Sequence, residues 1–190
     1  DYRRRDAQGA WALRSEFRLG TGLFGATSRP APAPDGQFFL WTGQVQRVQQ
    51  LNRKHLLIVQ ADGQFTGDNL VGSEQFFIGG PNSVRGYYQN QRFGDNGFRF
   101  SVADYITVLR DQENRSVIQV VPFVDTAYAW FNNSDVQSAI GDENFLLSTG
   151  LGLVASPVEG LDASVDVGVP LINIDGASDV LVDFSIRYRF

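Results

Sequence analysis

Apolar and polar residues alternate with a period of two along much of the chain, most clearly near the C-terminus. The odd positions from Leu161 to Leu171 are all apolar, whereas Asp162 and Asp166 are among the even positions. Successive side chains of a β-strand point to opposite faces, so this period predicts strands with one apolar and one polar face. The same pattern recurs over residues 180–190.

Six further segments have the composition of strands, which brings the expected number to about eight, with no convincing helix. Four of them alternate clearly, at 11–19, 57–65, 118–130 and 147–153. The other two, at 38–50 and 98–109, are strand-like in residue type but ambiguous in phase.

Long and short connections alternate between these segments. The long ones are expected at 28–36, 67–97 and 132–144, a medium one at 173–179, and the short ones at 52–54, 110–115 and 157–160. Outer-membrane β-barrels have this asymmetry, with short turns on the periplasmic side and longer loops outside. The pattern therefore predicts an all-β, antiparallel transmembrane β-barrel segment over residues 1–190.

A soluble antiparallel barrel or sandwich produces the same alternation, because one face of each strand is then a protein core and the other is wetted. Two observations favour the membrane barrel. The polar face combines charges with Gly and Ser, as in a lumen, and aromatic residues stand at strand ends, where interfacial girdles occur: Trp11, Tyr128, Trp130, Tyr188 and Phe190.

The composition excludes several functional classes. The net charge of -5, from 16 basic and 21 acidic residues, disfavours nucleic-acid binding. Cysteine is absent and His55 is the single histidine, which excludes thiol nucleophiles, cysteine metal sites and sites built from two or more histidines. We expect no catalytic residues, metal or cofactor, and we expect His55 to be a periplasmic or interfacial polar residue.

The charged residues of the polar faces are expected to point into the barrel interior. They line an aqueous channel if the complete barrel is large, and they satisfy one another if it closes tightly around its side chains. The set comprises Asp62, Asp104, Asp162, Asp166, Asp183, Arg14, Arg18, Arg187 and Arg189.

The longest connection carries a distinctive run. Gly79-Gly80-Pro81-Asn82 predicts a tight turn, Gly86 permits a close backbone approach, and Arg85 is a fork-shaped donor on the loop. A phosphate-binding loop is excluded, because no Gly-Lys-Ser/Thr follows and no helix is expected there. Asn173–Gly176 is interpreted as a turn. The full run is Glu74, Gln75, Phe76, Phe77, Ile78, Gly79, Gly80, Pro81, Asn82, Ser83, Val84, Arg85, Gly86 and Tyr87.

This run resembles the sixth extracellular loop of the superfamily of outer-membrane insertion and secretion barrels, whose hallmark is Val-Arg-Gly-Tyr/Phe. Its extended form, with Glu74-Gln75-Phe76 before Gly79-Gly80 and Ser83 before Val84, is most similar to the two-partner secretion transporters that export haemolysins and haemagglutinins.

Two further elements agree with the resemblance. Phe123 and Asp125 match the Phe-x-Asp-x-Gly motif of those barrels, although Ala127 replaces the glycine. The terminal strand, with Phe184, Ile186, Tyr188 and Phe190 at alternate positions, resembles the signal read by the outer-membrane assembly machinery.

The resemblance implies that the chain is the second half of a sixteen-stranded barrel in the outer membrane of a Gram-negative bacterium. Periplasmic POTRA modules and a signal peptide are not expected within this chain, which opens without a methionine and is interpreted as a processed or excised piece. The resemblance also implies that Arg85 folds into the lumen and pairs with Asp125.

The function implied is export of an unfolded exoprotein without nucleotide hydrolysis. The implied partners are that exoprotein, outer-membrane lipid and the assembly machinery. Two alternatives stay open: a self-closed eight-stranded barrel without transport activity, and part of a factor that inserts other barrels into the outer membrane.

Overall fold

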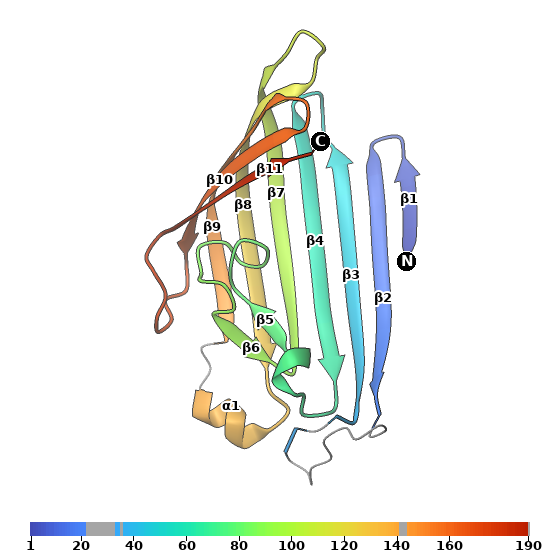
Figure 1. The fold of residues 1–190 in the computed structure, drawn as a ribbon, viewed down its shortest axis with the longest axis vertical. Helices are drawn as coiled ribbons and strands as arrows, with labels where there is room; N and C mark the ends of the chain where they lie inside the picture. The colour runs from blue at the N-terminus through green and yellow to red at the C-terminus, as the bar shows by residue number, and fades with distance from the viewer. Residues whose placement is uncertain (22–32, 35, 141–143, 190) are drawn as a thin grey trace.

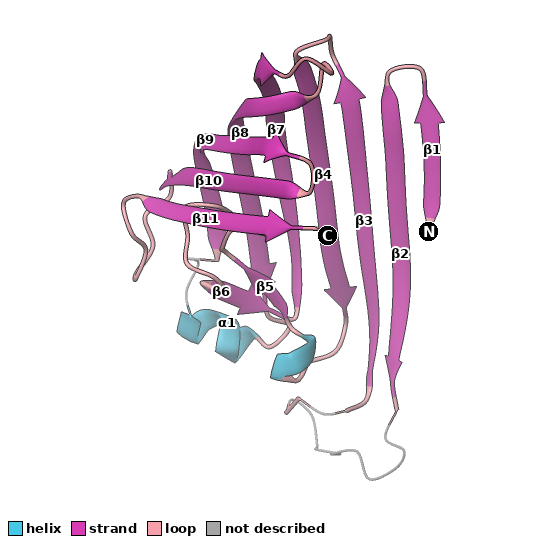
Figure 2. Cartoon of the chain, turned by 45° about the horizontal axis from the view of Figure 1, so that its top comes forward, coloured by secondary structure: helices cyan, strands magenta, loops and turns pink. Residues whose placement is uncertain are grey.

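A curved antiparallel sheet forms nearly the whole molecule (Figures 1 and 2). The computed structural model describes residues 1–21, 33, 34, 36–140 and 144–189, so most of the predicted Pro-rich loop at 28–36 lies outside the described residues. The sheet has nine strands in the order β1-β2-β3-β4-β7-β8-β9-β10-β11. Their bounds are Tyr2–Asp6, Gly9–Gly20, Phe38–Gln50, His55–Thr66, Asn96–Arg110, Ser116–Trp130, Phe145–Val158, Leu161–Pro170 and Leu181–Tyr188.

The prediction of an all-β antiparallel fold is confirmed, with one more strand in the sheet than expected. The additional strand is β1, which pairs with β2 from Tyr2↔Leu13 to Asp6↔Gly9. Within the described residues β1 and β11 are the two edges of the sheet and do not pair with each other, so the barrel is not closed. The alternative of a self-closed eight-stranded barrel is therefore wrong for this chain, because both edges keep unpaired backbone groups.

Four short turns lie at one end of the sheet and four longer connections at the other, as the alternation of loop lengths predicts. The long connection between β4 and β7 contains a short helical turn, Gly72–Glu74, and a small hairpin of β5 (Phe76–Ile78) and β6 (Arg92–Gly94). This hairpin and its tip lie on the concave face of the sheet, in front of β7, β8 and β9 (Figure 1). One short helix, α1 (Ser134–Ile140), was not expected from the sequence; the side chain of Asn133 accepts hydrogen bonds from the backbone at its N-terminus.

The convex face is apolar and exposed. On the last strand Phe184 is 80% exposed and Ile186 is 73% exposed, as expected for side chains that face lipid rather than a protein core. Aromatic rings pack in pairs on this face toward the end with the long loops, with centroid separations of 5.5–6.2 Å. The pairs are Phe17–Phe39, Trp41–Phe65, Phe65–Trp130, Tyr128–Trp130 and Phe98–Tyr128.

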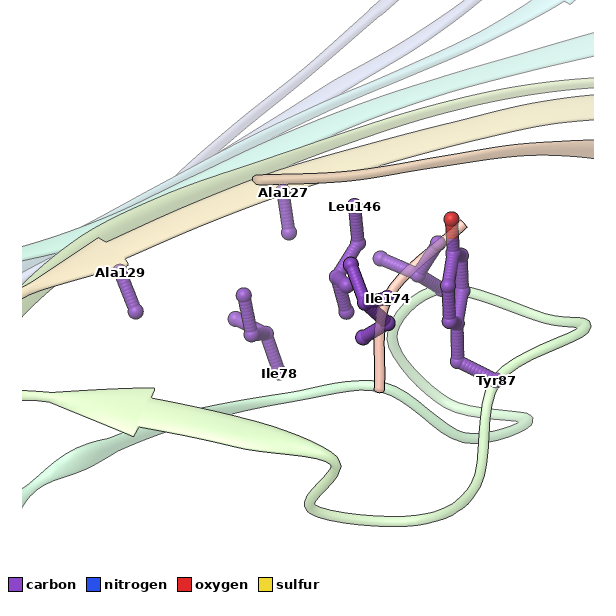
Figure 3. Packing of buried hydrophobic residues seen from close by; sticks show 7 residues of the cluster. Ile78, Tyr87, Ala127, Ala129, Leu146 and Ile174 are labelled. Atoms are coloured by element: carbon purple, nitrogen blue, oxygen red, sulfur yellow. The ribbon is translucent and has the colours of Figure 1, made fainter. Parts of the chain in front are cut away.

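The buried core lies on the concave face, between the sheet and the β4–β7 loop. Its main cluster joins Ala127, Ala129 and Leu146 of the sheet to three loop residues and to Ile174 of the β10–β11 connection (Figure 3). The loop residues are Ile78, Val84 and Tyr87. The concave face thus serves as the packing surface for a loop rather than for a second sheet.

Candidate functional site: the loop inside the barrel wall

The turn at the tip of the hairpin is held by its own backbone. Gly79 and Gly80 have φ values of +100° and +96°, which only glycine adopts readily. Gly79 N donates to Ser83 Oγ at 3.2 Å, and Gly80 N donates to Val84 O at 3.2 Å. These bonds reverse the chain and direct the following residues back toward the sheet.

Arg85 makes a bidentate ion pair with Asp125 of β8. Its Nε donates to Asp125 Oδ2 at 2.7 Å and its Nη2 donates to Oδ1 at 2.9 Å. The backbone N of Arg85 also donates to Oδ2, at 3.2 Å. Asp125 is 1% exposed, so a carboxylate is buried here with the geometry that a guanidinium matches best.

Neighbouring strands complete this arrangement. Ser101 Oγ of β7 donates to Asp125 Oδ1 at 2.6 Å, and Asp166 Oδ1 of β10 lies 3.4 Å from Arg85 Nη1. The guanidinium carbon stands 3.5 Å from the centre of the Phe123 ring, which places the cation over the ring face. Phe123 and Asp125 of the predicted strand motif are therefore both in contact with Arg85.

Gly86 lies directly against Gly168 of β10. A Cβ added to Gly168 would stand 2.4 Å from Gly86 N, and Gly86 itself has a φ of +91°. Sequence reasoning placed Asp166 on the lumenal face but did not identify its contact with Arg85, and it did not identify Gly168 or Ser101 as site residues. The small residues on the lumenal face of β10 were visible in the alternation, but their contact with a loop about 80 residues earlier in the chain was not.

Tyr87 is fully buried, with its hydroxyl between two elements. The hydroxyl lies 2.7 Å from Ile172 O and 3.0 Å from Leu147 O, both of which are acceptors. Val84, on the other side of Arg85, is also fully buried. The methyl group of Ala127, which stands where the family motif has glycine, fits into the same cluster with no exposed surface.

The first part of the loop motif lies apart from Arg85, at the base of the hairpin. Glu74 Oε2 accepts a hydrogen bond from Arg18 Nη1 of β2 at 3.1 Å, and Gln75 Nε2 donates to Leu70 O at 3.3 Å. Phe76 covers Gly97 of β7, where an added Cβ would stand 2.2 Å from the ring. These residues attach the loop to the wall rather than forming part of the ion-pair site.

The side chains of the predicted assembly signal lie elsewhere. Phe184, Ile186 and Tyr188 all point to the convex face of β11, where each is more than half exposed. Phe190 lies outside the described residues.

The prediction that Asp104 faces the lumen is wrong. Asp104 lies on the convex face, because it pairs in register with Leu57 and alternates with buried Ala103. Its Oδ2 lies 2.6 Å from His55 Nδ1. The ambiguous phase of this segment concealed its orientation.

Electrostatics favour the charged form of Arg85 and the neutral form of Tyr87. Burial lowers the pKa of Arg85, but the hydrogen bonds to Asp125 and the charges of Asp125 and Asp166 outweigh it, and the net pKa is above the usual arginine value. Burial raises the pKa of Tyr87. The hydroxyl therefore stays protonated and able to donate.

Across the described ranges no group of three or more His, Cys, Asp or Glu side chains is placed to hold a metal ion. No helix in the described residues is long and apolar enough to cross a membrane.

Comparison with known proteins gives consistent matches. The profile of the family "Haemolysin secretion/activation protein ShlB/FhaC/HecB" matches residues 1–125. The outer membrane transporter CdiB of Escherichia coli O6:K15:H31 (strain 536 / UPEC) is 25% identical over 177 residues, which is 88% of this chain. The chain spans 28% of the length of that relative.

Two solved structures have the same fold. CdiB from Escherichia coli superposes with a TM-score of 0.80 at 22% identity, covering 98% of this chain and 34% of that one. CdiB from Acinetobacter baumannii superposes with a TM-score of 0.74 at 21% identity, covering 98% of this chain and 31% of that one. Because the family profile covers more than half of the residues, the chain belongs to the haemolysin secretion/activation family ShlB/FhaC/HecB.

Proposed function

We propose that this chain is the C-terminal part of an outer-membrane pore that exports an unfolded exoprotein by two-partner secretion. Membership of the haemolysin secretion/activation family and similarity to proteins named outer membrane transporters support this proposal. The apolar convex face suits contact with outer-membrane lipid, and the polar concave face suits a lumen. The assembly machinery is proposed to read the alternating side chains of the terminal strand, which are Phe184, Ile186, Tyr188 and Phe190.

The observation that carries the mechanism is the anchoring of the β4–β7 loop by Arg85. A loop held against the concave wall narrows the lumen and fixes where the remaining space lies. Beside the loop tip is a cavity of about 450 Å³, lined mainly by polar groups that include Gln60, Ser101 and Arg99. Such side chains offer hydrogen bonds to an extended backbone, and no step requires catalysis or nucleotide hydrolysis.

The test uses the full-length transporter co-expressed with its exoprotein. Arg85→Ala leaves the buried Asp125 carboxylate without its countercharge, and Asp125→Ala leaves Arg85 only the longer contact with Asp166. We expect each variant to reduce secretion at least tenfold while insertion into the outer membrane persists. Arg115→Ala is the matched control, because Arg115 lies on the exposed β7–β8 turn. If both variants insert normally and secrete at the wild-type rate, the role given to the ion pair is wrong. If the unmodified transporter exports no exoprotein, the proposed function is wrong.

A further inference from the structure

The β10–β11 connection, residues 171–180, folds over the concave face and contacts the β4–β7 loop. Ile174 at its centre is 4% exposed, although its neighbours Asn173 and Asp175 are exposed. A large apolar side chain is thus inserted from a surface connection into a core that belongs to two other elements.

Figure 3 shows how this side chain is enclosed. Ala127 and Ala129 approach from β8, Ile78 and Tyr87 from the loop, and Ile174 lies between Leu146 and Tyr87. Ile172 and Ala177, from the same connection, pack against the cluster. The loop therefore cannot leave the wall without disrupting the packing around Ile174.

Polar contacts join the same two elements. Tyr87 Oη lies 2.7 Å from Ile172 O, and Tyr87 is two residues after Arg85. Farther along, Gln91 Nε2 and Arg92 Nη2 donate to Asp175 O at 3.4 and 3.3 Å. Beyond the attachments at its base, the loop is consequently held by an ion pair to the wall at Arg85 and by a packed contact with the connection at Tyr87.

We propose that residues 171–180 are a latch that holds the β4–β7 loop in the lumen, and that the latch opens when the pore admits its exoprotein. This inference rests on the proposed function. The packed contact encloses the Tyr87 side chain completely, so the loop cannot move away from the wall at Tyr87 unless this contact opens. Ile174 and Tyr87 are accordingly positioning residues, which act on transport through the loop.

The first experiment closes the latch covalently in the assembled full-length transporter. The chain contains no cysteine, so Gln91→Cys with Asp175→Cys introduces a single reactive pair here, and a short, reducible, bifunctional thiol reagent bridges the two elements. Ser164→Cys with Ser185→Cys is the control, because these hydroxyls lie 2.9 Å apart across β10 and β11 within the wall. Bridging after assembly avoids any effect on folding.

We expect the bridge at positions 91 and 175 to reduce secretion at least tenfold and reduction to restore it, with secretion unchanged for the control bridge. Undiminished secretion through the bridged latch overturns the inference while leaving the proposed function intact. Absence of secretion before any bridging counts against the proposed function instead.

The second experiment does not depend on transport. A single cysteine introduced as Val84→Cys is buried in the cluster, so its rate of reaction with a membrane-impermeant thiol reagent measures opening of the loop. Ile174→Ala is expected to raise this rate at least tenfold, whereas Val180→Ala, a substitution of an exposed residue in the same connection, leaves it unchanged. Equal rates in the two variants overturn the inference whatever the transporter carries.

Discussion

Gly168→Ala is a small substitution at a position where the structure leaves no room. The added Cβ would stand 2.4 Å from Gly86 N, 2.6 Å from Gly86 Cα and 2.7 Å from Arg85 C. All three atoms belong to the backbone of the lumenal loop, so no side-chain rotation relieves the contact. The loop must withdraw from β10 by about 1 Å to reach ordinary van der Waals separation.

The magnitude follows from what that withdrawal does to Arg85. Its hydrogen bonds to Asp125 measure 2.7 and 2.9 Å, and a shift of about 1 Å takes both beyond hydrogen-bonding range. Loss of one partner of a buried ion pair costs about 3–5 kcal/mol. At about 1.4 kcal/mol for each factor of ten, the loop then opens at least roughly a hundredfold more often.

Amide hydrogen exchange in the full-length transporter measures this opening directly, because Arg85 N donates to Asp125 Oδ2 in the closed loop. We expect the Arg85 amide to exchange at least roughly a hundredfold faster in Gly168→Ala, with strand amides unchanged. Gly72→Ala is the control, since an added Cβ there meets nothing within 4 Å. An Arg85 amide that exchanges within about twofold of the wild-type rate would refute the reasoning from steric contact.

Two further predictions concern polar contacts. Tyr87→Phe removes the hydroxyl that donates to Ile172 O, and we expect it to lower the free energy of opening the loop by about 1–2 kcal/mol. Amide exchange of the loop measures this free energy. An unchanged exchange rate would show that the hydroxyl does not stabilise the closed loop. The second prediction concerns Asp111 at the β7–β8 turn. Burial raises the pKa of this carboxyl, but the hydrogen bonds from Arg115 lower it by more than burial raises it, so the net pKa lies below the usual 3.8. The stabilisation from the Asp111–Arg115 contact is therefore fully present above pH 3.8, and it is lost as the pH falls through the lower pKa of Asp111 in the folded protein. An NMR titration of the turn should show this transition in the wild type and not in Asp111→Asn.

Most of the sheet was predictable because a period of two reflects a wall with lipid on one face and a lumen on the other. The exceptions have identifiable causes. The phase of residues 98–109 was ambiguous because the charged Asp104 lies on the convex face and Tyr105 lies on the concave face, against the usual polarity of the two faces. β1 was missed because it is five residues long and contains three consecutive arginines, which conceal the alternation.

The candidate site was predictable only in part. The residues around Arg85 and Asp125 resemble a known family pattern, and that resemblance implied that the two side chains form an ion pair, which the structure contains. The contacts that depend on three-dimensional packing could not be predicted from the sequence. Gly168, Asp166 and Ile174 lie more than 80 positions from the loop residues that they contact. No local period encodes which lumenal glycine a distant loop will approach.

The wall itself explains why those distant residues meet. Asp125 lies on β8 and Asp166 on β10, and the lumenal positions of β9 between them include Gly150 and Gly152. The Phe123 ring occupies the space above Gly150, where an added Cβ would stand 2.4 Å from it, so the ring and the guanidinium lie beside the two lumenal positions of β9 that have no side chain. The small residues on the lumenal face of β9 thus also allow one arginine to contact β8 and β10 at the same time.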